Sequence, residues 1–102
     1  MILEKLSNAM GVSGNEDAVR DIILEAIRPY VDDVTVDSMG NVIAHKAAKP
    51  GKSKAAGARV MIAAHMDEVG LMVTGYNGDG GIKFHYVGGM DDRVMPGLRV
   101  QL

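Results

Sequence analysis

The run Arg59-Val60-Met61-Ile62-Ala63-Ala64 is apolar at every position after its arginine. A strand that faces water on one side alternates apolar and polar residues, whereas a strand covered on both faces of an α/β sheet is apolar throughout. The run therefore predicts a buried strand and an α/β fold. His65 follows it directly, at the carboxyl end of the strand, which is the edge where ligands bind in open α/β sheets.

Two helices and a hairpin are expected before this strand. Residues 2–9 have an amphipathic pattern, and Ser13 with Glu16 has the spacing of a capping box at the start of a second helix. The apolar positions of that second helix fall on one face: Val19, Ile22, Ile23, Ala26 and Ile27. Residues 34–36 and 41–44 are rich in β-branched residues around a turn, which favours a hairpin.

The segments outside these elements differ in composition and in the structure they predict. Residues 47–58 are rich in Lys, Ala, Gly and Ser and predict a solvated loop. Residues 71–74 and 82–87, on either side of a glycine-rich turn, predict an all-β part. A further alternating strand is expected over residues 97–102, and it stops without a turn or cap, as if cut within the element.

Composition narrows the function classes. The chain has 102 residues, of which 47% are hydrophobic and 24% charged, as in globular domains. The net charge is -2 and the pI is near 5.8, so the sequence does not have the basic cluster that nucleic-acid-binding domains carry. With no cysteine, any metal must be held by nitrogen and oxygen ligands, and a reducing cytoplasm suits the chain. No signal-peptide core and no run near the ~20 apolar residues of a membrane span is present, so we expect a cytoplasmic protein without membrane contact.

His65 and Asp67 form a candidate metal-binding pair. A neutral imidazole is a good ligand for zinc or cobalt, and its second ring N–H is usually held by a carboxylate. On an extended chain positions i and i+2 face the same way, so Asp67 is placed to support His65, while Glu68 faces the other side. The spacing alone is weak, and a polar strand end with a satisfied histidine is the alternative.

The surrounding residues are more specific. The stretch His65-Met66-Asp67-Glu68-Val69-Gly70 after an apolar strand resembles the first metal-binding motif of metallopeptidase family 42, the glutamyl and tetrahedral aminopeptidases, some of which have been labelled endoglucanases. Four more segments are similar to the family's, in the family's order: residues 11–16, 37–44, 87–89 and 94–100.

The resemblance implies an aminopeptidase with two divalent metals, zinc or cobalt, in an α/β catalytic domain that a β-rich domain interrupts. In such enzymes a metal-activated water attacks the first peptide bond of a peptide substrate and a glutamate is the general base. By position His65 would be a metal ligand and Asp67 its orienting partner. Residues 1–70 would then belong to the catalytic domain and residues 71–102 would start the inserted domain. A homo-oligomer is implied for the complete protein.

The family's remaining ligands and its general base lie downstream of anything in this sequence, so we expect the isolated chain to be inactive. His45 and His85 are most simply satisfied or surface histidines of β segments, and the resemblance places Glu68 beside the ligand and not in the role of the base. The glycine clusters at 77–81 and 87–89 suit β-turns and predict no nucleotide site.

Three alternatives stay open. The chain could belong to a related dinuclear hydrolase with another substrate class, such as a carboxypeptidase or a deacylase. The chain could be a non-enzymatic oligomerisation or interaction domain that retains His65 and Asp67 as a relic. A glucanase fits poorly, because glycoside hydrolysis normally needs two carboxylates across the bond and no histidine-bound metal. Without its neighbouring strands, the first part of the catalytic sheet should also leave apolar surface uncovered and favour self-association.

Overall fold

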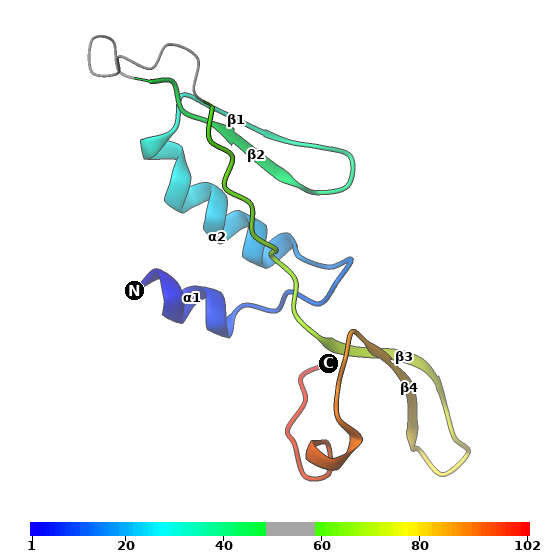
Figure 1. The fold of residues 1–102 in the computed structure, drawn as a ribbon. Coiled ribbons are helices and arrows are strands. Elements are labelled where there is room, and N and C mark those ends of the chain that lie inside the picture. Colours follow the sequence, from blue (N-terminus) through cyan, green and yellow to red (C-terminus); the bar gives the residue numbers. More distant parts are fainter. Residues whose placement is uncertain (49–58) are drawn as a thin grey trace.

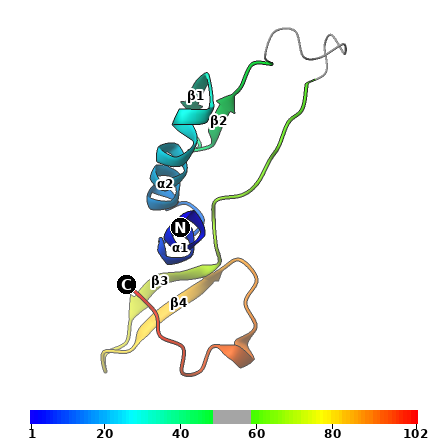
Figure 2. The same cartoon turned by 90° about the vertical axis from the view of Figure 1, so that its left-hand side faces the viewer.

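The computed structural model describes residues 1–48 and 59–102 of an elongated molecule, with extents of 69 × 28 × 23 Å. Two helices and a first hairpin lie at one end, and a second hairpin lies at the other (Figures 1 and 2). Most of the loop predicted over residues 47–58 lies outside the described residues. Within the described part of the chain, no helix is long and apolar enough to cross a membrane.

The two predicted helices are present as α1 (Ile2–Asn8) and α2 (Asp17–Ile27), and α1 packs on α2. The predicted capping box at the start of α2 is wrong. Glu16 is the N-cap and makes no side-chain cap hydrogen bond, and the Ser13 hydroxyl donates to Asp67 instead. The reason is that a long-range carboxylate satisfies Ser13, while Glu16 Oε1 accepts from the Gly14 amide at 2.6 Å.

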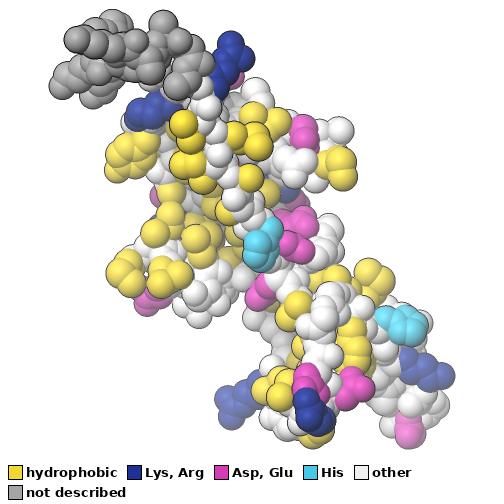
Figure 3. Space-filling model, in the orientation of Figure 1, with side chains coloured by type: hydrophobic (Ala, Val, Ile, Leu, Met, Phe, Trp, Pro, Cys, Tyr) yellow, Lys and Arg dark blue, Asp and Glu magenta, His cyan; other side chains and the backbone are white. Residues whose placement is uncertain are grey.

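The apolar core is very small. Among the described residues Val19 of α2 is the one buried hydrophobic side chain, at 7% exposure. Large apolar side chains are spread over the visible surface of the helical end instead (Figure 3). The expectation of uncovered apolar surface is confirmed, because too few layers are present to bury the faces that the sequence makes apolar.

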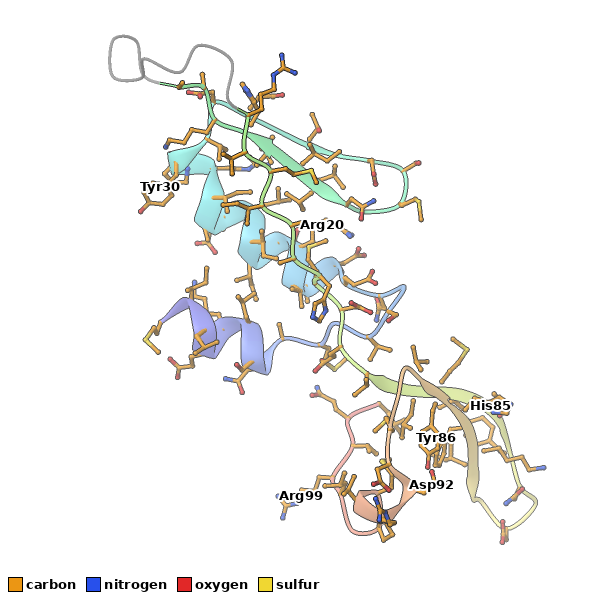
Figure 4. The ribbon with its side chains drawn as sticks, in the orientation of Figure 1. Arg20, Tyr30, His85, Tyr86, Asp92 and Arg99 are labelled. Atoms are coloured by element: carbon orange, nitrogen blue, oxygen red, sulfur yellow. The ribbon has the colours of Figure 1, made fainter. Side chains whose placement is uncertain are left out.

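The first hairpin pairs β1 (Asp33–Val36) with β2 (Val42–His45) in antiparallel register, and the short 3₁₀ helix η1 (Arg28–Tyr30) leads into it from α2. The hairpin prediction is confirmed. Arg20 of α2 extends to the turn of this hairpin, where its Nη1 donates to the Gly40 carbonyl at 3.3 Å (Figure 4). This contact ties α2 to the hairpin.

The strand predicted over residues 59–64 is not formed in the described chain. These residues are extended and pair with no strand among the described residues, and Val60, Met61 and Ile62 are 86%, 89% and 91% exposed. The prediction of a buried strand is wrong for this reason: an apolar strand needs neighbours on both edges and layers on both faces, and the described residues supply neither. The mixed α/β character stands.

The second hairpin pairs β3 (Gly70–Tyr76) with β4 (Ile82–Val87), with an irregularity between Val73 and Gly75. The all-β prediction for this region is confirmed. After β4 comes the 3₁₀ helix η2 (Asp92–Val94). The strand predicted over residues 97–102 is wrong, because this stretch pairs with no other strand of the described chain.

Candidate functional site

His65 and Asp67 lie on the extended connection that leads into β3. His65 Nδ1 is 2.8 Å from the Asp67 carbonyl oxygen and 3.0 Å from Asp67 Oδ1. Both oxygens are acceptors, so Nδ1 must carry the ring proton in the neutral imidazole. The lone pair is therefore on Nε2, and the His65 side chain is 84% exposed. This is the tautomer in which a histidine can give Nε2 to a metal.

The Asp67 carboxylate is held from two sides. Its Oδ1 accepts from His65, and its Oδ2 accepts from the hydroxyl of Ser13. These hydrogen bonds, that from Ser13 first and that from His65 second, lower the pKa of the Asp67 carboxyl below its ordinary value. The group is thus an ionised acceptor at neutral pH, and this keeps the proton on His65 Nδ1.

The loop that carries Ser13 is clamped to the segment that carries Asp67. The Glu68 amide donates to the Gly11 carbonyl at 2.7 Å, and the Gly11 amide donates to Glu68 Oε1 at 3.2 Å. Val12 and Glu68 form a parallel β-bridge at the same place. These contacts bring two segments that are far apart in the sequence side by side.

Glycine makes this close approach possible. A Cβ atom at Gly70 would lie 2.4 Å from Val12 Cγ2, and one at Gly11 would lie 2.6 Å from Val19 Cγ2 and 3.3 Å from the Met66 carbonyl oxygen. Real Cβ atoms do not come so near to other atoms. The glycines therefore let the loop pack between α2 and the start of β3.

A cavity of about 430 Å³ opens beside the pair, between α2, the first hairpin and the extended connection. His65 and Asp67 form part of its wall. Most of the remaining wall is apolar: Ile23, Ile27, Met39, Val42, Ala44, Ile62, Ala64 and Met66. Figure 3 shows a histidine next to acidic side chains near the middle of this face. The cavity is large enough for a small organic group.

The pair by itself cannot complete a metal centre. No group of three or more His, Cys, Asp or Glu side chains that could hold a metal exists within residues 1–48 and 59–102. The described residues can supply one imidazole ligand with an oriented ring, and further ligands would have to come from elsewhere.

Comparison with known proteins gives the family. The family profile described as M42 glutamyl aminopeptidase matches residues 40–102, more than half of the chain. The chain belongs to the M42 glutamyl aminopeptidase family. Membership of the M42 family implies a metallopeptidase, and M42 relatives of this chain are named as aminopeptidases.

Relatives of the chain in this family are much longer. A relative from Acetivibrio thermocellus is 43% identical over 100 residues, which cover 98% of this chain and 28% of that protein. The lysyl aminopeptidase of Pyrococcus furiosus is 37% identical over 90 residues, which cover 87% of this chain and 24% of that protein. The chain thus spans about a quarter of the length of the relatives it matches.

Solved structures also match this chain over only part of their own length. A Thermotoga maritima protein described as an endoglucanase superposes with a TM-score of 0.78 at 41% identity, covering 93% of this chain and 29% of that chain. An aminopeptidase from the archaeon Desulfurococcus kamchatkensis gives a TM-score of 0.78 at 34% identity, covering 90% and 24%. The described fold therefore matches part of M42 structures.

The other candidate residues of this M42 chain lie away from the pair or have structural partners. His45 ends β2 and is exposed, and His85 is exposed on β4, opposite Met72 (Figure 4). Glu68 is engaged with the Gly11 amide. Figure 4 also shows Tyr86 next to Asp92, whose carboxylate raises the pKa of the tyrosine.

Sequence reasoning missed Ser13 as a partner of the site. The spacing of Ser13 and Glu16 imitates a helix cap, and Gly11 and Gly14 indicate only a break before the helix, so no local signal points to Asp67. Gly14 has a φ of 88°, a left-handed conformation that breaks the approach to the helix and turns the loop toward the connection before β3.

Proposed function

We propose that this chain is the N-terminal portion of a metal-dependent aminopeptidase that removes the N-terminal residue from peptides, with His65 as a ligand to one metal and Asp67 as its orienting partner. The observation that carries the proposal is the pair of contacts on His65 Nδ1, at 2.8 and 3.0 Å, which leave Nε2 with its lone pair and exposed. Ligating histidines in proteins are typically held in this way through their second nitrogen.

The chemistry of the donor set fits a metal of the zinc or cobalt type. The chain has no cysteine, and its candidate ligand is a neutral imidazole beside a carboxylate, a set that borderline-soft divalent ions accept. Two such ions in the complete site would polarise the peptide carbonyl and lower the pKa of water. In this chain, His65 would offer Nε2 to the metal, and Asp67 keeps the ring proton on Nδ1 and fixes the plane of the ring.

The proposed domain division places residues 1–70 in an α/β catalytic domain and residues 71–102 at the start of an inserted β-rich domain. The position of the second hairpin supports this division, because β3 and β4 pack on each other at the end of the molecule away from β1 and β2 (Figure 1). The homo-oligomer and the cytoplasmic location stay predictions.

Glucanase activity receives less support from the site. A glycosidase normally needs two carboxyl groups across the scissile bond, available to the substrate. Here both oxygens of Asp67 accept hydrogen bonds from Ser13 and His65, and Glu68 accepts from Gly11. An aminoacyl anilide and a cellulosic substrate, assayed side by side with the whole protein, separate the two activities. Hydrolysis of the cellulosic substrate alone would refute the aminopeptidase proposal.

A pair of histidine variants tests the metal ligand in the whole protein. His65→Ala should lower the bound zinc or cobalt, measured by elemental analysis after dialysis, and abolish hydrolysis of the anilide. His45→Ala is the matched control, because His45 is also exposed but lies at the end of β2. Full metal content in the His65→Ala variant would contradict the proposal.

A further inference from the structure

We propose that Ser13 is a positioning residue for His65 and acts through Asp67. The Ser13 hydroxyl donates to Asp67 Oδ2 while His65 Nδ1 donates to Asp67 Oδ1, so the three side chains form one continuous chain of hydrogen bonds. The consequence for metal binding rests on the proposed function, but the positioning itself does not.

The Asp67 carboxylate needs a second restraint to hold the imidazole in one orientation. The terminal torsion of an aspartate is broad, so a carboxylate bonded through one oxygen can swing about its last bond. Packing gives little help, because the side chains of His65 and Asp67 are 84% and 40% exposed. A donor on Oδ2 fixes the carboxylate plane, and Oδ1 then meets the ring nitrogen in a constant direction.

Ser13 is itself held in place independently of Asp67. The backbone of its loop is clamped by the two Gly11–Glu68 hydrogen bonds and by the Val12–Glu68 bridge. On the other side of Ser13, the Asn15 amide donates to the Val12 carbonyl at 2.8 Å and closes a turn. The preformed loop therefore holds the Ser13 hydroxyl next to the carboxylate of Asp67, which is 54 residues away in the sequence.

Two other roles for Ser13 do not fit the geometry. A helix cap is excluded because Glu16 is the N-cap of α2 and no side chain caps that helix. A nucleophile needs a base that takes its proton, such as an imidazole nitrogen. Ser13 bonds to the Asp67 carboxylate, a much weaker base than an imidazole, and not to a nitrogen of His65.

The tautomer of His65 tests the positioning without metal. We would record long-range ¹H–¹⁵N correlations of the metal-free whole protein in mildly alkaline buffer. The wild-type chain should show the Nδ1–H tautomer. Ser13→Ala should shift part of the population toward Nε2–H, which is favoured in water, while the Asp67 carbonyl at 2.8 Å still accepts from Nδ1 in the remainder. Ser13→Thr keeps the hydroxyl and should restore Nδ1–H, and Ser7→Ala on α1 is a control that should change nothing.

Metal affinity and kinetics in the whole protein give the second readout. Changing an outer partner of a metal ligand typically costs 10–100-fold in metal affinity, and Ser13 is one residue further out, so Ser13→Ala should weaken zinc binding by about tenfold or less. The kcat for an aminoacyl anilide should fall with KM unchanged, because Ser13 touches no substrate. Ser13→Thr should recover both values.

The outcomes separate this inference from the proposed function. An unchanged tautomer in Ser13→Ala would overturn the positioning role, even if His65→Ala still loses metal. A shifted tautomer with full metal content in His65→Ala would sustain the positioning role and reject the metal ligand. If Ser13→Ala also loses protection of the Glu68 amide, the threonine variant decides: a shifted tautomer there overturns the inference, and a retained one supports it.

Discussion

The contact between Gly70 and Val12 gives a sharp prediction about how the two segments of the site are held together. Replacing Gly70 by alanine would put a Cβ atom 2.4 Å from Val12 Cγ2 and 2.8 Å from Val12 Cγ1. Both methyl groups of the valine would have to move at once, and a single rotation about χ1 cannot clear both. Val12 would be pushed away from the bridge that it forms with Glu68.

The size of the effect follows from the cost of overpacking. An extra methyl group in a closely packed contact typically costs about 1–3 kcal/mol. If the loop relieves the clash by opening, that free energy appears as an increase of about 5- to 150-fold in the open population of the bridge. The Glu68 amide, which donates to the Gly11 carbonyl at 2.7 Å, reports this opening directly.

Amide hydrogen exchange measures the opening, and Gly75→Ala is the matched control. Gly75 lies on the same strand, and a Cβ atom there would meet nothing within 4 Å. We expect Gly70→Ala to speed exchange of the Glu68 amide by about 5- to 150-fold and Gly75→Ala to leave it unchanged. Equal exchange rates in the two variants would refute the idea that close glycine packing holds the Ser13 loop against the connection before β3.

Three further predictions concern the core, pH and activity. Val19→Ala removes about two buried CH₂-sized groups and should lower the free energy of unfolding, measured in urea, by about 1.6 kcal/mol. Val60→Ala, at an exposed position, should change it by less than about 0.5 kcal/mol. Equal losses in the two variants would contradict the placement of the core. Hydrogen bonds from the Asn41 side chain and backbone, and one from the Met39 amide, lower the pKa of Asp37 below 3.8. These hydrogen bonds therefore stabilise the first hairpin above pH 3.8, and the stabilisation is lost as the pH falls through the lowered pKa. A carboxyl ¹³C titration with a midpoint at or above 3.8 would reject this assignment. The isolated 102-residue chain should not hydrolyse an aminoacyl anilide with added zinc or cobalt. Metal-dependent turnover by this chain that is absent from a His65→Ala preparation purified in the same way would contradict the expectation.

Local patterns predicted most of the elements. The helical spacing of apolar residues in α2 and the β-branched residues around the turn of the first hairpin act over a few neighbouring positions, and both elements formed where expected. The run before His65 carries a different kind of information. Its apolar residues require covering layers on both faces, and a strand cannot form without them, so the predicted buried strand is absent from the described chain.

The candidate site also contains one contact that local spacing predicts and one that it does not. The contact between His65 and Asp67 follows from the two-residue periodicity of an extended chain, so it could be anticipated. Ser13 could not, because its partner is 54 residues away and its spacing to Glu16 imitates a helix cap. A short polar side chain takes whichever acceptor the tertiary structure brings near, and local spacing does not contain that information.

Anomalous X-ray diffraction from cobalt-loaded crystals of the whole protein tests the central claim most directly, namely that Nε2 of His65 binds a metal while Asp67 holds Nδ1. We expect an anomalous peak bonded to Nε2 of His65, with the Nδ1–Asp67 hydrogen bond retained. A metal bonded to Nδ1, or a metal centre that excludes His65, would contradict the claim.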